Sequence, residues 1–285
     1  MNRQLRGLAM LSLVTVIWGS TFVVVKGALS DFPPSLLMLL RFALATLFFL
    51  PQLARSRGVW RAGFELGFWA ALGYATQTIG LQYTSAGRSA FITALSVVLV
   101  PLLAGLSGKQ VRPLVWLGAV ASFIGVGLLA YDGSPPNVGD LWTLATALTY
   151  ALYIVALERR AAEHDALVLT FTQLVWLTLL VGGWSLLSGD LLELGRLSIP
   201  WPAIFYLAVA ATALTTWLMA SAQRHVSAPE AAIVYSLEPV WAALFAYILI
   251  GEKLGLQGWL GGILVVAAVV IAQVGSNSGA RPLRE

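Results

Sequence analysis

The sequence predicts an all-helical membrane protein, in which ten transmembrane helices form two inverted five-helix repeats around a central cavity. Three observations lead to this fold class. Of the 285 residues, 59% are hydrophobic and only 11% are charged, whereas a soluble domain is about a quarter charged. Apolar stretches of about 20 residues, the length that crosses a bilayer as a helix, recur along the whole chain. Parts of the sequence also repeat at a nearly constant spacing.

The expected spans are apolar runs separated by helix breakers. Proline and glycine lie between the runs, for example at Pro33-Pro34, Gly133 and Pro200, and both residues commonly end or begin helices. The first run, from Gly7 to Val25, is not followed by a small-residue cleavage site, so we expect a span and not a signal peptide. The ten expected spans are 5–27, 34–53, 63–82, 86–106, 113–131, 139–157, 166–187, 200–222, 229–249 and 255–275.

The distribution of Lys and Arg predicts the orientation, because positively charged loops tend to stay in the cytoplasm. If the N-terminus is inside, twelve of these residues lie in inner segments, four lie in outer segments and Arg41 lies within a span. We therefore expect both termini in the cytoplasm, as an even number of helices requires, and a location in the bacterial inner membrane. The inner residues are Arg3, Arg6, Arg55, Arg57, Arg61, Lys109, Arg112, Arg159, Arg160, Arg224, Arg281 and Arg284, and the outer residues are Lys26, Arg88, Arg196 and Lys253.

Two blocks in the first half of the sequence have similar counterparts in the second half. Gly108-Lys109-Gln110-Val111 matches Gly251-Glu252-Lys253-Leu254, and Trp116-Leu117-Gly118 matches Trp259-Leu260-Gly261, both at an offset of 143 residues. Residues 1–134 are therefore expected to form one five-helix repeat and residues 135–285 the second. Because five is odd, the halves have opposite orientations in the membrane. Such inverted repeats are typical of transporters whose halves rock about a site near the midplane.

Several function classes are excluded by composition. The basic residues are scattered over short loops and do not form one nucleic-acid-binding face. The chain has no cysteine, which excludes thiolate metal sites. The histidines, His164 and His225, lie in loops, and no second carboxylate accompanies Glu238 at membrane depth, so an intramembrane enzyme is not expected. A channel is disfavoured because there is no ring of like charges. We expect no cofactor, no metal and no nucleic-acid partner.

Four strings resemble a transporter family. They are Trp18-Gly19-Ser20-Thr21-Phe22, Leu40-Arg41-Phe42-Ala43-Leu44-Ala45, Ser236-Leu237-Glu238-Pro239-Val240 and Gly251-Glu252-Lys253-Leu254. The chain thereby resembles the drug/metabolite transporter superfamily in its ten-helix EamA-type branch, and is most similar to the YddG-like amino-acid exporters. The resemblance implies a cavity lined mainly by helices 1, 3, 4, 6, 8 and 9, with helices 5 and 10 at the periphery. It also implies export of small organic solutes such as amino acids.

The first half departs from this pattern. Ser96-Val97 occupies the position in helix 4 that matches Glu238-Pro239 in helix 9, and Lys109 matches Glu252. A symmetric mechanism with one carboxylate in each repeat is therefore not expected.

Arg41 and Glu238 are the only charged residues in the middle of the apolar stretches, where a charge costs at least ~2.5–3.5 kcal/mol. Glu238 is a candidate for binding an ammonium group or a coupling proton. The alternative is a structural carboxyl, hydrogen-bonded to a neighbouring helix or to the kink that Pro239 produces. Arg41 is expected to be a structural charge that snorkels outward or ties helix 2 to backbone carbonyls. Binding of an anionic substrate is the alternative for Arg41, although helix 2 is not expected to line the cavity.

Polar and aromatic residues at helical spacing are candidates for the cavity walls. Polar stripes occur on one face of helices 3 and 8, and aromatic residues occur in helices 1, 6 and 9. Hydrogen bonds between spans are the alternative interpretation. Neutral polar and aromatic walls suit amphiphilic or zwitterionic solutes better than multiply charged ones. The candidate substrate-binding residues are Trp18, Tyr74, Gln77, Thr78, Tyr150, Tyr153, Thr215, Thr216, Tyr235 and Glu238.

Arg88 is a candidate gating residue at the outer mouth. It lies at the N-terminal end of helix 4, where a cation opposes the helix dipole, and it could attract a carboxylate or simply lie at the interface. Its counterpart in the repeat, Glu230, completes a capping box with Ser227. Gly258 and Gly262 have the spacing of a close helix contact, which we expect between the two halves and not between two chains, so we expect a monomer.

The expected function is a secondary transporter that exports small organic solutes, such as amino acids or related metabolites, by alternating access. Its partners are then a small-molecule substrate, an amino acid or amphiphilic metabolite, and the lipid bilayer. An importer or a facilitative permease for small metabolites is the main alternative, because sequence does not set the direction of the driving force. An intramembrane enzyme is the remaining alternative.

Overall fold

The computed structural model describes residues 3–130, 135–250 and 255–277, and all regular elements in these ranges are helical. The string at residues 251–254, the expected boundary between the repeats at residue 134, and Arg281 and Arg284 lie outside these ranges. The elements are α1 (Arg3–Ala28), α2 (Pro34–Leu47), η1 (Leu50–Arg55), α3 (Trp60–Tyr83), α4 (Ala86–Thr93), α5 (Ser96–Leu106), α6 (Pro113–Ala130), α7 (Val138–Glu163), α8 (Ala166–Leu187), α9 (Asp190–Glu193), η2 (Leu194–Arg196), α10 (Trp201–Ala208), η3 (Val209–Leu214), α11 (Thr215–Ala222), α12 (Ala228–Tyr235), α13 (Glu238–Ile250) and α14 (Leu256–Asn277).

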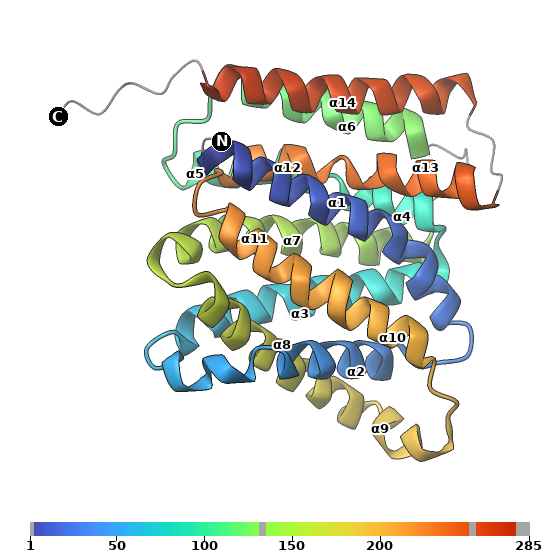
Figure 1. Ribbon diagram of the computed structural model, residues 1–285. Coiled ribbons are helices and arrows are strands. Elements are labelled where there is room, and N and C mark those ends of the chain that lie inside the picture. The colour runs from blue at the N-terminus through green and yellow to red at the C-terminus, as the bar shows by residue number, and fades with distance from the viewer. Residues whose placement is uncertain (1–2, 131–134, 251–254, 278–285) are drawn as a thin grey trace.

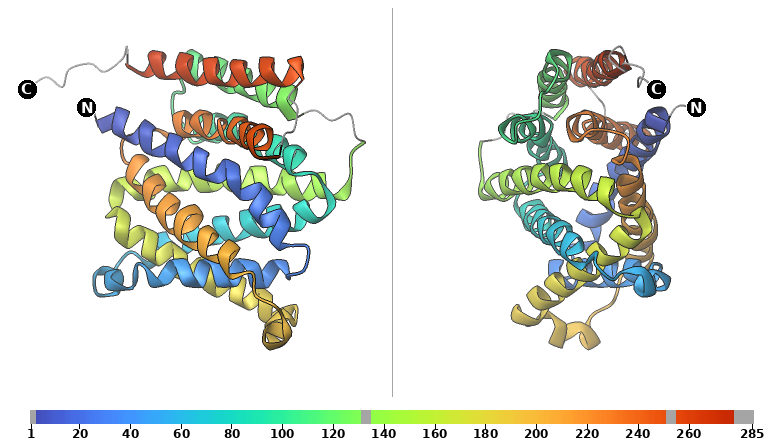
Figure 2. Two further views of the ribbon diagram at one scale, coloured as in Figure 1. Left: turned by 45° about the vertical axis from the view of Figure 1, so that its right-hand side comes forward. Right: turned by 90° about the vertical axis from the view of Figure 1, so that its left-hand side faces the viewer.

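Most helices run roughly side by side along one direction (Figure 1). α6 and α14 pack against each other and form one edge of the bundle, which is also visible when the helices are viewed end-on (Figure 2). The start of α1 and the end of α14 lie at the same end of the bundle (Figure 1). The core therefore lies between the α6–α14 pair and the helices α2 and α8 at the opposite edge.

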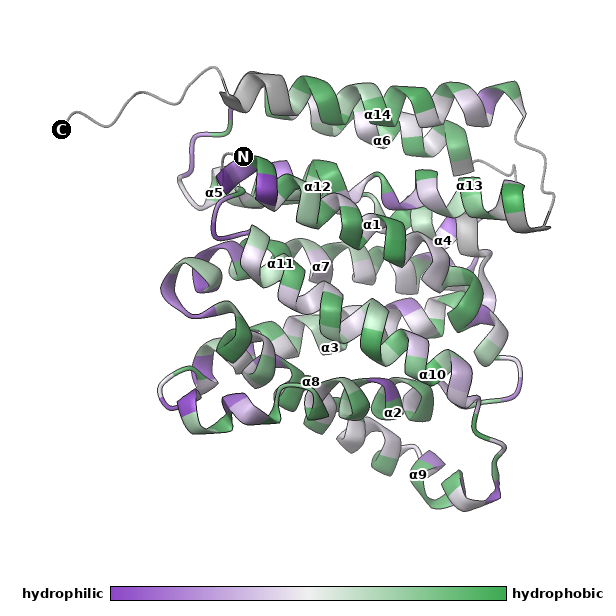
Figure 3. Ribbon diagram, viewed as in Figure 1, coloured by the Kyte–Doolittle hydropathy of each residue, from purple (hydrophilic) through white to green (hydrophobic). Residues whose placement is uncertain are grey.

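Several of the described helices are apolar enough to cross a membrane. Five of them meet both the length and the hydropathy expected of a span, namely Arg3–Ala28, Arg88–Leu106, Val138–Glu163, Ala166–Leu187 and Trp201–Ala222. Hydrophobic residues make up much of α6 and α14 (Figure 3), and several of them are exposed, for example Leu117 at 56% and Ile263 at 63%. So large an apolar surface is unfavourable in water, and the chain is a multi-pass membrane protein.

Two of the expected helices are broken near their middle, one between α4 and α5 and the other between α12 and α13. At each break an amide bonds three residues back instead of four: Leu95 N donates to Ile92 O at 3.1 Å, and Leu237 N donates to Val234 O at 3.0 Å. Pro239 predicts the second break, because a helix interior does not tolerate proline well. The first break has no such proline, yet Leu95 and Leu237 are 142 positions apart, within one residue of the 143-residue offset between the repeated blocks.

Two other expected spans differ in detail. The expected span 34–53 ends at Leu47, and a short 3-10 helix that contains Pro51 follows it. The expected span 200–222 is present as α10, η3 and α11, of which η3 is a π-helix. A π-helical turn changes the direction of the side chains and is frequently found at functional sites.

α6 and α14 approach each other closely at Gly125 and Gly261. A Cβ atom added to Gly261 would lie 2.5 Å from the carbonyl oxygen of Gly125. Gly261 thus lets these helices approach closely, and the neighbouring Gly262 of the expected Gly258–Gly262 pair also lies against α6, since an added Cβ atom there would be 3.6 Å from Leu129 Cδ1. Neither α6 nor α14 contributes to the central cavity.

Candidate functional site

A cavity with a volume of about 80 Å³ lies inside the bundle, at the level of the two helix breaks. Residues of α1, α2, α3, α4, α5, α7, α8, α11, α12 and α13 line it. One water molecule needs ~10–15 Å³, so this conformation has room for several waters or for part of a small solute. The polar, aromatic and charged side chains of the lining are Trp18, Arg41, Tyr74, Gln77, Thr93, Ser96, Tyr150, Tyr153, Gln173, Thr216, Tyr235, Ser236 and Glu238.

Glu238 is the first residue of α13 and lines the cavity directly after the helix break. The start of a helix carries a partial positive charge, which stabilises a carboxylate there. The side chain is partly exposed. Among the residues that the structure describes, no hydrogen-bond or ion-pair partner of its carboxylate is found. The carboxylate therefore remains available to a molecule inside the cavity.

Trp18 joins α1 to η3 and α11, which pack directly against α1. Its Nε1 donates to Ala211 O at 3.2 Å and to Thr215 Oγ1 at 3.3 Å. The neighbouring Gly19 allows α1 to approach α13, because a Cβ atom there would lie 2.7 Å from Trp241 Cβ. In the string that begins at Trp18, the indole of Trp18 thus lines the cavity and Gly19 forms the contact between α1 and α13.

Arg41 is 3% exposed and is held by η3. Its Nε donates to Thr212 Oγ1 at 2.5 Å, and its Nη2 donates to Ala211 O at 3.0 Å. The guanidinium carbon also lies 4.9 Å from the ring centroid of Tyr74, which is a cation–π distance. Arg41 ties helix 2 to a backbone carbonyl, and it also lines the cavity. The structure thus differs from the expectation for helix 2, because the buried face of α2 packs against η3 and α8 and reaches the interior.

Tyrosine and glutamine side chains form the rest of the polar wall. The rings of Tyr74 and Tyr150 meet edge to face at 5.7 Å, and Tyr150 OH donates to Gln77 Oε1 at 3.4 Å. Tyr153 OH donates to Gln173 Oε1 at 2.9 Å. Gln173 was not predicted from the sequence, and it brings α8, the seventh expected span, into the lining. The available signal was that Gln173 is the only amide side chain in the apolar run 166–187.

The structure brings most of the sequence-predicted residues together. Thr78 and Thr215 are the two that it does not place in the lining. Thr78 is buried within α3, turned about 100° from Gln77. Thr215 donates to Ala211 O and accepts from Trp18, so it supports the wall from behind. The predicted residues that do line the cavity are Trp18, Tyr74, Gln77, Tyr150, Tyr153, Thr216, Tyr235 and Glu238.

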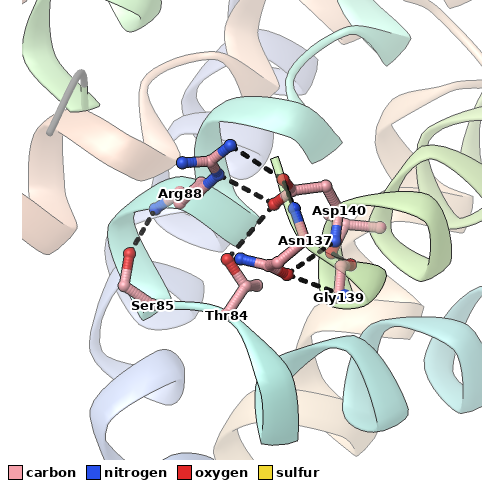
Figure 4. A network of polar contacts seen from close by, with 7 residues as sticks. Thr84, Ser85, Arg88, Asn137, Gly139 and Asp140 are labelled. Atoms are coloured by element: carbon pink, nitrogen blue, oxygen red, sulfur yellow. Dashed lines mark hydrogen bonds and ion pairs between the residues drawn. The ribbon is translucent and has the colours of Figure 1, made fainter. Parts of the chain in front are cut away.

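Arg88 lies outside the cavity and pairs with Asp140 (Figure 4). Its Nε and Nη2 donate to the two carboxylate oxygens of Asp140, each at 2.8 Å. Asp140 also accepts hydrogen bonds from the backbone of Asn137 at 2.8 Å and from Thr84 Oγ1 at 3.3 Å. Arg88 lies in the first turn of α4 and Asp140 in the first turn of α7. This ion pair therefore joins the first half of the chain to the second. Sequence reasoning missed the pair, because 52 residues separate its members.

The cavity can recognise charge at two points, the Glu238 carboxylate and the Arg41 guanidinium, and between them it offers phenol hydroxyls and aromatic faces. Aromatic faces and a carboxylate together attract an ammonium group. Among the described residues, no group of three or more His, Cys, Asp or Glu side chains is arranged to hold a metal ion.

Comparisons with known proteins agree with this arrangement. The model of the EamA-like transporter family matches residues 5–131 and 137–273. A curated protein of Archaeoglobus fulgidus, described as an uncharacterized transporter, is 33% identical over 93% of this chain and 84% of its own length. The uncharacterized transporter YdfC of Bacillus subtilis is 27% identical over 93% of this chain and 90% of its own length. A crystal structure with 18% identity shares the fold, with a TM-score of 0.74 over 96% of this chain and 99% of that one.

Proposed function

Because the chain belongs to the EamA-like transporter family, we propose that this membrane transporter exports small zwitterionic or amphiphilic solutes, amino acids or related metabolites, through the central cavity. The observation that carries the proposal is Glu238. It begins a helix at a break, faces the cavity and has no partner among the described residues. A structural carboxyl would be hydrogen-bonded, whereas a carboxylate that meets a substrate ammonium or exchanges a proton must stay accessible.

We further propose that the chain crosses the membrane ten times as two inverted repeats and works by alternating access. Two helix breaks at the repeat spacing, both beside the cavity, support this mechanism, because discontinuous helices commonly form the midplane site of such transporters. Both termini then lie in the cytoplasm of a bacterial cell, in its inner membrane.

The topology is testable with single cysteines in this cysteine-free chain. Ser30 and Arg57 are both exposed and lie in consecutive connections of the bundle. Ser30→Cys is expected to react with an impermeant maleimide in intact cells, whereas Arg57→Cys is expected to react only after lysis. Labelling of both cysteines from the same side would refute the orientation.

The role of Glu238 is tested by Glu238→Gln in proteoliposomes loaded with labelled amino acids. We expect flux driven by a pH gradient to fall by roughly tenfold or more, since one charge-assisted hydrogen bond contributes ~1.5–3 kcal/mol and 1.36 kcal/mol is a factor of ten in rate. Glu158→Gln, which removes a carboxylate bonded to Lys109 outside the cavity, is the control and should transport like the parent. If Glu238→Gln transports normally while Glu238→Ala does not fold, Glu238 is structural.

Import and facilitated diffusion are the competing functions. The same liposomes distinguish them, because an exporter driven by protons accumulates substrate on the acidic side, whereas a facilitative permease only equalises the concentrations. A panel of neutral, acidic and basic amino acids with one cationic drug defines the substrate class.

A further inference from the structure

A second hollow, of about 300 Å³, lies where α1 begins and α11 ends. Gly7 brings the two helices together there, because an added Cβ atom would lie 2.7 Å from Val226 Cγ2 and 3.1 Å from Ala222 O. This end of α1 is strongly hydrophilic (Figure 3). The lining residues are Arg3, Arg6, Gly7, Met10, Ser221, Arg224 and His225.

The arginines of this hollow have no acidic partner in the described part of the chain. Arg3, Arg6 and Arg224 form neither an ion pair nor a side-chain hydrogen bond there, whereas Arg159 and Arg160 elsewhere both pair with Glu65. Three guanidinium groups around one hollow repel each other, and a bound anion would offset this repulsion. Guanidinium groups bind phosphate oxygens in a bidentate manner.

The carboxylate beside the hollow is already engaged. Glu230, at the start of α12, accepts hydrogen bonds from the backbone amide of Ser227 at 3.1 Å and from Gln4 Nε2 at 3.4 Å. It therefore does not neutralise the arginines through an ion pair.

Beyond the hollow, α1 and the continuous η3–α11 segment carry exposed apolar side chains, which we call the α1–α11 seam. The two helices run antiparallel, since Gly7 lies against Ala222 and Trp18 bonds to Thr215. Leu13 follows Arg6 by seven positions and is 47% exposed, and Leu214 precedes Ser221 by seven positions and is 37% exposed. Residues seven positions apart lie on the same face of a helix. The seam therefore places exposed leucines about two helical turns from the basic hollow.

We propose that this hollow is a binding site for an anionic phospholipid, whose phosphodiester is held by Arg3, Arg6 and Arg224 and whose acyl chain lies along the α1–α11 seam. The apolar seam favours a lipid over a free phosphate. Basic pockets between transmembrane helices bind anionic headgroups in this way. The site is separate from the central cavity, and its test needs no transport measurement.

The test measures lipid retained by detergent-purified, delipidated protein after incubation with phosphatidylglycerol or phosphatidylcholine, by native mass spectrometry. We expect the parent to retain phosphatidylglycerol selectively, and Arg6→Gln with Arg224→Gln to retain at least tenfold less. The matched control is Arg57→Gln with Arg61→Gln, which removes the same charge from exposed residues that line neither cavity and should bind like the parent. If the first pair does not fold, Arg6→Lys with Arg224→Lys keeps the charge but loses the bidentate geometry, and should lose part of the binding.

Several outcomes would overturn the proposal. Equal retention of both lipids by the parent would show that the hollow does not select an anionic headgroup. Equal losses in the two charge-removing pairs would show a general charge effect and not a site. Displacement of phosphatidylglycerol by inorganic phosphate or glycerol phosphate, at matched ionic strength, would show a site for a soluble anion and not for a lipid.

Discussion

The ion pair between Arg88 and Asp140 is expected to be a major contribution to the stability of the contact between the two halves. Both side chains are largely buried, with 15% and 10% exposed, and both carboxylate oxygens are bound at 2.8 Å. Asp140→Asn preserves the shape but removes the negative charge that binds the guanidinium at these two points. Breaking one partner of a buried ion pair costs about 3–5 kcal/mol, and the remaining exposure places our expectation near 3 kcal/mol.

An exposed ion pair provides the comparison. Lys109 and Glu158 are also joined at 2.7 Å, but their side chains are 47% and 21% exposed. Solvent screens such a pair, and its contribution is typically below about 1 kcal/mol. Glu158→Gln is therefore expected to lower the free energy of unfolding far less than Asp140→Asn, although each change removes one carboxylate.

The assay is reversible unfolding in mixed micelles, followed by tryptophan fluorescence. The double variant Arg88→Gln with Asp140→Asn should be less destabilised than the sum of the single variants, with a coupling of about 1–3 kcal/mol. If Asp140→Asn costs no more than Glu158→Gln, or if the two single effects add, the pair does not stabilise the contact and the reasoning from burial is wrong.

Two further substitutions test the packing of the bundle. Gly261→Leu should separate α6 from α14 and destabilise the protein by about 1–3 kcal/mol or more, because even an added Cβ atom would lie 2.5 Å from the Gly125 carbonyl oxygen. Gly105→Leu is the control, because no atom lies within 4 Å of a Cβ atom added there. Similar detergent melting temperatures for both variants would contradict the assigned contact. Gly73→Ala places a methyl group against the Tyr150 ring. It should reduce transport of the proposed amino-acid substrates several-fold with little change in the melting temperature. Gly183→Ala, where no atom lies within 4 Å of the added Cβ, should leave transport unchanged. Unchanged transport by Gly73→Ala would remove Tyr150 from the binding wall.

Much of the site could be predicted from the sequence, because charge and hydropathy are local properties. A lone carboxyl such as Glu238 in an apolar stretch must face protein or water wherever the helix packs. Helical spacing likewise placed Tyr74 and Gln77 on one face. That prediction extended one position too far, to Thr78, since periodicity defines a face only to within a residue or so.

Other features depend on how the helices pack against each other. Arg41 meets Thr212 across 171 positions, Arg88 meets Asp140 across 52, and Gln173 enters the cavity only because α8 lies beside α7 and α3. The break at Leu95 could not be predicted from a proline, because no proline lies within five residues of it. Hydropathy and helical spacing describe one helix at a time, whereas each of these contacts depends on the distance and rotation between two helices. The membrane class and the two charges within the spans, Arg41 and Glu238, could therefore be read from the chain, whereas the partners of Arg41 and the Arg88–Asp140 pair were decided by the tertiary structure.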